Sequence, residues 1–256
     1  DNSDIIIHAA ATKIVPTAEY NPAECVKTNI SGALNVIEAV RHSNVKQVVA
    51  LSTDKASAPI NLYGATKLVS DKLFVAANLN SETAFSIVRY GNVMGSRGSV
   101  IPFFIEQSKG HKFTVTDERM TRFMISLDDG VELVNHALQD MLGGEIYVKK
   151  ISSMKVIDIA HIINPNAEIE LIGIRTGEKL QEQMIGLEDA PFTYEYDNHF
   201  KILPSINNWY LDENRIKKGV KVALDFQYTS DSNPDWMQPE FLSNYLASKE
   251  FKENLS

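Results

Sequence analysis

S-T-D-K-A-S-A-P-I-N-L-Y-G-A-T-K, residues 52–67, follows the apolar run V-V-A-L and leads into the amphipathic pattern L-V-S-D-K-L-F-V-A-A-N. The apolar run is typical of a buried strand in a parallel sheet, and the amphipathic pattern is typical of a helix. The polar block from Ser52 to Lys55 therefore falls at the carboxyl end of a strand. Since ligands bind at that edge of open parallel sheets, the stretch predicts a ligand site between a strand and a helix.

Tyr63 and Lys67 stand four residues apart at the start of the expected helix, so their side chains share one helix face. A tyrosine with an ordinary pKa near ~10 is a poor base at neutral pH, and a fixed ammonium group nearby lowers that pKa by stabilising the phenolate. The pair thus predicts a tyrosine that can accept a proton from an alcohol. The alternative is a tyrosine packed at a helix start beside a solvated lysine, because Y-x-x-x-K alone arises often by chance.

Strands and helices are expected to alternate along the first third of the chain. The segments D-I-I-I-H-A-A, V-K-Q-V-V-A-L-S and A-F-S-I-V-R-Y read as strands. Between the first two, a helix beginning at an Asn-Pro pair carries apolar residues at helical spacing: Val26, Ile30, Leu34 and Ile37. These four residues predict the helix face that packs on the sheet. The alternation predicts an α/β fold with a doubly wound, parallel, Rossmann-like sheet.

The remainder of the chain has longer loops and no internal repeat or clear linker. We expect residues 1–92 to form what remains of a dinucleotide-binding domain, with 127–163 returning to it. Residues 93–126 and 164–256 are expected to form a smaller, interwoven substrate-binding lobe. A dinucleotide fold normally opens with a strand, a Gly-rich turn and a helix, and no G-x-G-x-x-G occurs here. We therefore expect the chain to be truncated, and its sheet incomplete, at the amino terminus.

Composition narrows the function classes. With 256 residues, 44% of them hydrophobic, the chain can bury a sizeable core. Its net charge of -8 leaves no basic field, which argues against nucleic acid or anionic membrane as general partners. The single cysteine, Cys25, excludes an intrachain disulfide and fits a reducing cytoplasm, where we expect the protein to act. No apolar run approaches the roughly 20 residues that cross a bilayer, and the histidines lack metal-ligand spacing.

Taken together, these motifs resemble the extended short-chain dehydrogenase/reductase family. Within it, the chain is most similar to the soluble inverting UDP-N-acetylglucosamine 4,6-dehydratases that begin pseudaminic acid synthesis. The resemblance covers nearly the whole chain and extends from the stretch quoted above to H-A-A-A-T-K, A-E-Y-N-P, R-Y-G-N-V-M-G-S-R-G-S-V-I-P-F-F, M-T-R-F, G-G-E-I-Y-V-K-K, I-G-I-R-T-G-E-K-L and F-Q-Y-T-S-D.

The resemblance implies four catalytic residues. Tyr63 takes the proton of the sugar 4-hydroxyl during oxidation by NADP, with NAD as the alternative cofactor, and Lys67 contacts the nicotinamide ribose. Lys55 then removes the C5 proton, and Asp54 protonates the departing C6 hydroxyl. Reprotonation of C5 from the opposite face inverts it. From the residues alone the last two roles stay open, because an ordinary aspartate is a poor acid and an ordinary lysine a poor base at pH 7.

Two further sets of residues follow from the resemblance. The cofactor set comprises His8, Ala9, Ala10, Ser52, Tyr63, Lys67 and Tyr90. The set for the substrate, UDP-N-acetylglucosamine, comprises Lys13, Thr53, Asn92, Arg97, Arg122, Arg175 and Glu178. Planar arginine forks suit its pyrophosphate, and Glu178 would accept from ribose hydroxyls. Asn29 is expected to support the site structurally, and His8 and Lys13 could equally be a structural histidine and a solvated lysine. No metal is expected.

The full-length protein is expected to form a homo-oligomer, and three alternative functions stay open. A retaining UDP-sugar dehydratase is the nearest, although the membrane-anchored relatives of that type commonly carry methionine in place of Tyr63. A nucleotide-sugar 4-epimerase would keep Tyr63 and Lys67 but has less need of Asp54 and Lys55. Outside catalysis, the chain could be an inactive fragment or assembly subunit that does not hold the cofactor.

Overall fold

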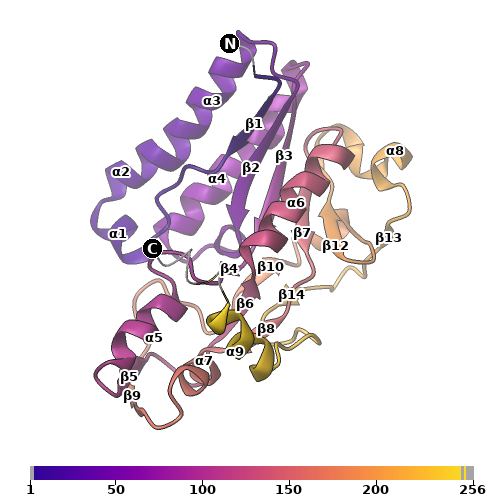
Figure 1. Cartoon of the computed structure of the whole chain (residues 1–256). Helices are drawn as coiled ribbons and strands as arrows, with labels where there is room; N and C mark the ends of the chain where they lie inside the picture. Colours follow the sequence, from indigo (N-terminus) through magenta and orange to yellow (C-terminus); the bar gives the residue numbers. More distant parts are fainter. Residues whose placement is uncertain (1–2, 249–250, 252–256) are drawn as a thin grey trace. The chain divides into compact units, whose positions relative to one another are not determined.

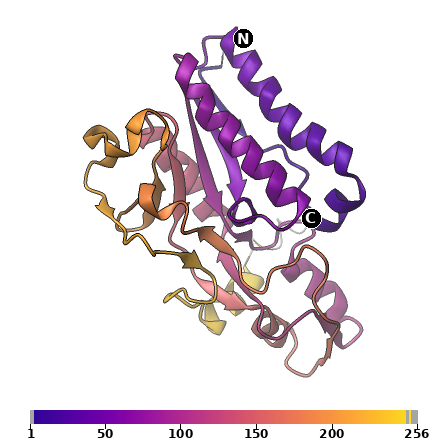
Figure 2. The same ribbon diagram turned by 180° about the vertical axis from the view of Figure 1, so that it is seen from behind.

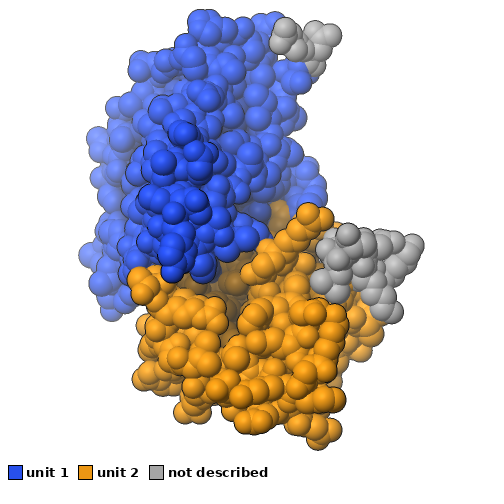
Figure 3. All heavy atoms as spheres, turned by 90° about the vertical axis from the view of Figure 1, so that its left-hand side faces the viewer, with its two compact units in different colours: residues 1–90, 131–150, 183–228 blue, residues 91–130, 151–182, 229–256 orange. Residues whose placement is uncertain are grey.

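The computed structural model describes residues 3–248 and 251, and it divides them into two compact units, each described by itself below. Figure 3 colours unit 1 blue and unit 2 orange. Unit 1 runs up to Tyr90 and adds Val131–Lys150 and Gln183–Tyr228, and unit 2 comprises Gly91–Gly130, Ile151–Glu182 and the segment from Thr229 onward.

Unit 1 is built on a seven-stranded sheet. In spatial order its strands are β1 (Ile5–His8), β2 (Gln47–Thr53), β3 (Ala84–Tyr90), β7 (Ile146–Lys149), β12 (His199–Ile202), β11 (Thr193–Glu195) and β13 (Val220–Lys221). The first four strands are parallel, and β12, β11 and β13 extend the sheet antiparallel. The carboxyl ends of the parallel strands therefore share one edge. This confirms the predicted fold class.

Helices and short turns connect these strands. They are α1 (Val15–Tyr20), α2 (Pro22–Val26), the π-helix η1 (Lys27–Ser31), α3 (Gly32–Arg41), the 3-10 turn η2 (Asp54–Ala56), α4 (Leu62–Ala77), η3 (Asn78–Asn80), α6 (Leu127–Asp140), η4 (Ala190–Phe192), η5 (Ile206–Leu211) and α8 (Glu213–Ile216). Strand β10 (Gln183–Ile185) pairs with β14 (Tyr228–Thr229) in a separate ribbon.

The sheet is covered on both faces, as the apolar strands require. Val49 and Val88 pack with Leu133 and Ala137 of α6 on one face (Figure 1). Figure 2 shows the other side, where α3 and α4 run next to each other. Phe74 of α4 contacts the ring of Phe85 on β3 there, with centroids 6.1 Å apart. Successive side chains of a strand point to opposite faces, which places Phe85 and Val88 on different layers.

The buried face of the helical segment between β1 and β2 differs from the predicted one. Val26 is 38% and Leu34 is 47% exposed, so two of the four apolar residues face outward. Ile37 is buried as predicted, together with Cys25, Asn29, Ala33 and Val40. The π-helix η1 inserts a wider turn into the segment, which rotates everything after it relative to a regular helical pattern.

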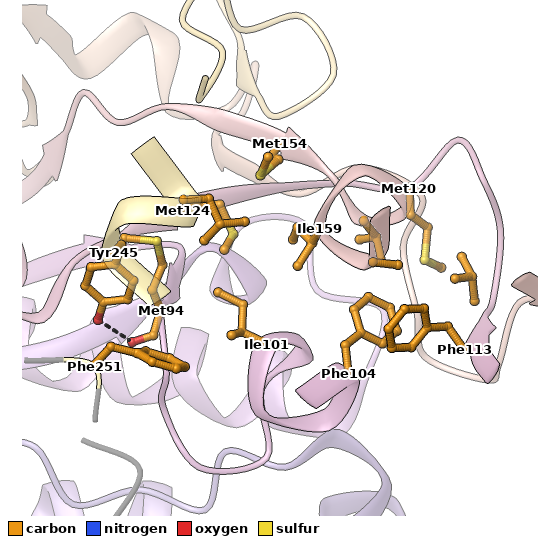
Figure 4. Packing of buried hydrophobic residues seen from close by; sticks show 14 residues of the cluster. Met94, Ile101, Phe104, Phe113, Met120, Met124, Met154, Ile159, Tyr245 and Phe251 are labelled. Atoms are coloured by element: carbon orange, nitrogen blue, oxygen red, sulfur yellow. Dashed lines mark hydrogen bonds between the residues drawn. The ribbon is translucent and has the colours of Figure 1, made fainter. Parts of the chain in front are cut away.

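Unit 2 has its own core (Figure 4). Its elements are β4 (Asn92–Val93), α5 (Val100–Ser108), β5 (Lys112–Val115), β6 (Thr121–Ile125), β8 (Ser153–Lys155), α7 (Val156–Ile163), β9 (Glu168–Leu171) and α9 (Pro239–Ala247). Phe104 and Phe113 lie with ring centroids 5.2 Å apart, and Tyr245 donates a hydrogen bond to the carbonyl of Met94. Strands β4, β6 and β8 form one small sheet, and β5 pairs parallel with β9 in another.

The compact units differ from the predicted lobes by a few residues at two boundaries, 91–92 and 127–130, and in two longer segments. Residues 151–163, expected with the dinucleotide-binding domain, belong to unit 2, because β8 pairs with β6 and α7 packs against α5. Residues 183–228, expected in the substrate lobe, belong to unit 1, because β12 pairs with β7 and so extends the main sheet.

A buried histidine in unit 1 makes stability pH-dependent. The ring of His199 lies 4.4 Å from that of His136 and stacks at 4.5 Å on Tyr196. The pKa of His199 is lowered to about 4, first because burial disfavours the charged ring and then because His136 and Lys201 lie nearby, while Asp140 opposes the shift. An unfolded histidine takes up its proton near pH ~6.5, so acid between these two values favours the unfolded state.

We predict that the wild type loses on the order of 1 kcal/mol more of its free energy of unfolding than His199→Gln does when the pH drops from ~6.5 to ~4. Urea unfolding at several pH values measures it. His42→Gln is the matched control, because the His42 side chain is 78% exposed. Equal pH dependence of the wild type and His199→Gln would show that His199 does not carry the effect.

Candidate active site

The polar block at the end of β2 folds into a hydrogen-bonded cluster. Thr53 caps the turn η2 by accepting from the backbone N–H of Lys55 at 3.3 Å. The Thr53 hydroxyl donates to Asp54 Oδ1 at 2.8 Å, and Lys55 Nζ donates to the same oxygen at 3.1 Å. Asp54 is fully buried, whereas the Lys55 side chain is 22% exposed. A buried carboxylate is thus paired with an ammonium group that solvent can still reach.

A glycine lets α4 approach this cluster. Asn61 caps the helix by accepting from the N–H of Gly64 at 2.8 Å. A Cβ atom on Gly64 would lie 2.1 Å from the carbonyl oxygen of Lys55, far inside van der Waals contact. Only glycine therefore allows the first turn of α4 to pack on η2, and this packing brings Tyr63 next to Lys55.

Gly64→Ala should therefore destabilise the protein by about 2–3 kcal/mol, because the backbone of η2 has to move away from the new methyl group. Denaturant unfolding gives the number. Gly130→Ala is the control: Gly130 lies in α6 with nothing within 4 Å of its added Cβ, so this change should stabilise by up to about 1 kcal/mol. If Gly64→Ala unfolds like the wild type, the close approach is not required.

Tyr63 joins the cluster through Thr53. Burial raises the pKa of Tyr63 to about 12, a hydrogen bond with Thr53 and the charge of Lys55 oppose this rise, and the charge of Asp54 adds to it. The ammonium group whose charge opposes this rise is that of Lys55, and the expected effect of Lys67 on the Tyr63 phenolate stays a prediction. Tyr63, Thr53, Asp54 and Lys55 form one continuous polar cluster at the carboxyl end of β2.

Lys67 lies one turn further along α4, in a buried environment. Its side chain belongs to the helix face that also buries Tyr63, and the residue is 3% exposed. Burial lowers the pKa of Lys67, and the negative charge of Asp71 counteracts that shift. His8, at the end of β1, is buried against Phe74, and burial followed by the charge of Lys67 lowers the pKa of His8.

Asn29 fixes the loop that follows β1. Its amide accepts from the N–H of Thr12 at 2.8 Å and donates to the carbonyl of Thr12 at 3.0 Å and to Thr66 Oγ1 at 3.0 Å. Asn29 is buried inside the π-helix η1, so it ties this loop to α4. The adjacent Lys13 is exposed, and burial of part of its side chain together with the charge of Lys55 lowers the pKa of Lys13. Lys13 therefore lies within electrostatic reach of the cluster.

A second buried network, which the sequence patterns did not reveal, lies behind the cluster. The hydroxyl of Ser52 donates to Asp71 Oδ2 at 2.7 Å, so it is engaged inside the protein. Arg89 on β3 is 2% exposed, and its guanidinium lies 3.7 Å from the same Asp71 oxygen and 3.0 Å from Asp189 Oδ2. It also donates to the carbonyl of Met184. The sequence feature that could have indicated this network is Arg89, a charged residue inside the apolar strand A-F-S-I-V-R-Y.

The candidates that lie in unit 2 have different surroundings. Arg122 donates to the carbonyls of Thr121 and Leu180, and its Nε lies 3.6 Å from Glu182 Oε1, so its guanidinium is held by the protein. Arg175 and Glu178 face each other, with the backbone N–H of Arg175 donating to the carboxylate at 3.2 Å.

Two unit 2 candidates and one from β3 complete the set. Arg97 is exposed in a turn. Asn92, in β4, has a buried Oδ1 without a hydrogen-bond partner among residues 3–248 and 251. Tyr90, predicted to contact the cofactor, ends β3 beside Thr53 in the sheet register, and burial raises its pKa. The predicted set thus falls into a unit 1 group around η2 and a unit 2 group of nucleotide candidates.

The edge of unit 1 fits a nicotinamide nucleotide. Ala9 and Ala10 follow β1 as exposed residues without bulky side chains, so a flat ring can approach the strand end. The buried His8 leaves its Nε2 without a hydrogen-bond partner in the described part of the chain, and it lies within electrostatic reach of Lys67. Within residues 3–248 and 251, no group of three His, Cys, Asp or Glu residues could hold a metal ion. Nor is any helix there long and apolar enough to span a membrane.

Comparisons with known proteins agree with this geometry. The profile of a family described as polysaccharide biosynthesis protein matches residues 1–204. The chain is 55% identical over 245 residues to the UDP-N-acetylglucosamine 4,6-dehydratase (inverting) of Campylobacter jejuni subsp. jejuni serotype O:2, covering 91% of this chain and 73% of that protein. It is 40% identical to the UDP-glucose 4-epimerase of Rickettsia bellii, covering 89% of this chain and 69% of the epimerase.

Among solved structures, the X-ray structure of Pen from Bacillus thuringiensis superimposes with a TM-score of 0.87 at 37% identity, covering 98% of this chain and 78% of that one. The parallel sheet with Tyr63 and Lys67 at its carboxyl edge defines a protein of the short-chain dehydrogenase/reductase class. Within that class, the chain belongs to the polysaccharide biosynthesis protein family.

Proposed function

We propose that this protein is an inverting UDP-N-acetylglucosamine 4,6-dehydratase that uses NADP. The observation that carries the proposal is the hydrogen-bonded cluster in which Thr53 joins Tyr63 to the Asp54–Lys55 pair. Oxidation of the sugar at C4 needs, besides the cofactor, only one proton acceptor, and Tyr63 can serve as that group. Elimination of water needs an additional acid and base near the same sugar ring, and this cluster supplies both. The identity of 55% to an inverting dehydratase supports the same conclusion.

The reaction begins with Tyr63, which accepts the proton of the sugar 4-hydroxyl. A nicotinamide held beside Ala9, Ala10 and Lys67 would supply the hydride acceptor for C4 and the hydride donor for C6, so that no cofactor would be consumed. The charge of Lys55 stabilises the phenolate of Tyr63, and the Thr53 hydroxyl can donate to that phenolate when it turns away from Asp54. Loss of either contribution should raise the pKa of Tyr63 further and so leave less phenolate to accept the proton.

The Asp54–Lys55 pair supplies the acid and the base for elimination. As an ion pair, neither group has the protonation state that the step needs. Transfer of one proton along the 3.1 Å hydrogen bond from Lys55 Nζ to Asp54 Oδ1 gives a neutral amine and a carboxylic acid. Displacement of water by substrate favours this neutral form, because burial penalises charges. Neutral Lys55 then takes the C5 proton made acidic by the C4 ketone, and Asp54 protonates the departing C6 hydroxyl.

Binding of the nucleotide is proposed for the unit 2 candidates. Arg175 is the strongest phosphate ligand, because its guanidinium is 49% exposed and lies 3.9 Å from Glu178, a pair that solvent or a ligand can separate. Arg122 is the weaker candidate, since two carbonyls and Glu182 already hold it. The preference for NADP over NAD, the homo-oligomeric state and the pseudaminic acid pathway stay predictions.

A nucleotide-sugar 4-epimerase is the second candidate, favoured by the 40% identity to epimerases. The experiment that separates them is incubation of the protein with UDP-N-acetylglucosamine and NADP, followed by NMR of the sugar. We expect a 4-keto-6-deoxy sugar with inverted C5. A product that keeps its C6 hydroxyl and differs at C4 would identify an epimerase, a retained C5 would identify a retaining dehydratase, and an unchanged sugar would reject all three.

A further inference from the structure

We propose that Asp71 is a positioning residue whose carboxylate, held by Ser52 and Arg89, is the buried counterion of Lys67; its catalytic meaning rests on the function proposed above. Asp71 is 2% exposed and follows Lys67 by four residues on α4, so both side chains project from the same side of the helix. No part of the proposed chemistry uses Asp71 directly. The charge of Asp71 nevertheless acts on Lys67.

The contacts of Asp71 favour the ionised carboxylate. Its Oδ2 accepts a hydrogen bond from Ser52 Oγ at 2.7 Å and lies 3.7 Å from the guanidinium of Arg89. Its Oδ1 is buried and has no hydrogen-bond partner among the residues that the structure describes. Burial raises the pKa of Asp71, while Arg89, Lys67 and Ser52 all act against that rise. Donation to a carboxylate and a fixed arginine charge both stabilise its ionised form.

The charges around Lys67 balance only when Asp71 is ionised. Arg89 is charged at all relevant pH values and already has Asp189 at 3.0 Å. Asp71 is the negative group whose charge opposes the effect of burial on the pKa of Lys67, and Lys67 in turn lowers the pKa of His8 on β1. Further along α4, Lys72 adds a weaker positive charge near Asp71. Lys67, Arg89, Asp71 and the partly exposed Asp189 thus form a network of two positive and two negative groups, in which an uncompensated charge at the buried Lys67 would be costly.

Removal of the carboxylate should reduce the charge on Lys67. In Asp71→Asn the attraction that opposes burial is lost, so the pKa of Lys67 falls further and more of the lysine becomes neutral near pH 7. If the ammonium form is the one that holds the nicotinamide ribose, activity is lost as pH rises through the pKa of Lys67. A lower pKa therefore moves this alkaline decline in activity to lower pH.

The test is an NMR titration of the protein labelled with ¹³C at the lysine ε-carbons, with the Lys67 signal assigned from Lys67→Arg. We expect Lys67 to be charged at pH ~7 in the wild type and its pKa to fall by about one unit or more in Asp71→Asn. Glu38→Gln removes one carboxylate from an exposed position on α3 and should leave the titration unchanged. Asp71→Glu, which keeps the charge, should restore it at least partly.

Two outcomes would overturn the proposal: a neutral Lys67 in the wild type near neutral pH, or identical Lys67 titrations in the wild type and in folded Asp71→Asn. If Asp71→Asn does not fold, the wild-type titration alone decides. The pH profile of sugar turnover provides the second readout, with its alkaline limb moving in the same direction as the pKa of Lys67. The titration does not depend on sugar turnover. If the wild type does not dehydrate the sugar but the pKa of Lys67 still falls in Asp71→Asn, the dehydratase proposal is rejected and the counterion proposal is retained.

Discussion

Tyr63→Phe should lower the rate of sugar turnover about 10³-fold while leaving the fold and the affinity for UDP intact. The change removes one hydroxyl from a residue that is 8% exposed and leaves the ring that packs on Ala18 and Cys25. What is lost is the proton acceptor for the 4-hydroxyl together with its hydrogen bond to Thr53. Steady-state kinetics with UDP-N-acetylglucosamine measure the rate, and calorimetric titration with UDP measures the affinity.

Tyr20→Phe is the matched control, because Tyr20 is 86% exposed on α1 and the same hydroxyl is removed there without consequence for the site. A Tyr63→Phe variant that keeps more than about a tenth of the wild-type rate would exclude Tyr63 as the base. A loss of UDP affinity that matches the loss of rate would instead indicate a structural role.

Lys55→Met should lower the rate of water elimination about 10²- to 10³-fold. Methionine keeps an apolar stem of similar length, and Thr53 still donates to Asp54. The ammonium group that carries the transferable proton is gone, however, so neither the neutral amine nor the protonated Asp54 can form from the pair. Mass spectrometry of the sugar product quantifies the dehydrated species directly.

Lys27→Met provides the comparison, since the Lys27 side chain is 68% exposed and pairs with the equally exposed Glu24 three residues earlier. If Lys55→Met still dehydrates the sugar at a rate close to that of the wild type, the base has to be sought elsewhere. If the wild type interconverts C4 epimers and Lys55→Met does so equally well, the epimerase is correct.

Local patterns were sufficient to predict the elements that build the site. The apolar run before Ser52 and the periodicity after Tyr63 predicted β2 and α4, and the capping residue Asn61 and the close contact of Gly64 explain why those elements meet. The predicted group of Asp54, Lys55 and Tyr63 lies together because these residues are close in sequence. Short-range order of this kind needs no knowledge of distant partners.

Long-range partners could not be predicted in the same way. Arg89 pairs with Asp189, one hundred residues further along the chain, and no spacing rule connects the two. Residues 183–228 belong to unit 1 because β12 pairs with β7, and this long-range pairing could not be predicted from local patterns either. The buried face of the segment from Pro22 to Arg41 was predicted only in part, because Ile37 is buried while Val26 and Leu34 face outward, and the π-helix within it departs from the regular period. The direction of the Tyr63 pKa depended on burial, which a sequence does not display.

The most direct measurement of the central claim follows a deuterium label placed on C4 of UDP-N-acetylglucosamine. If oxidation at C4 and elimination across C5 and C6 take place in one site, the label should appear in the C6 methyl group of the dehydrated sugar, as read by NMR. Recovery of the label on C4 of a sugar that still carries its C6 hydroxyl would contradict the dehydratase mechanism.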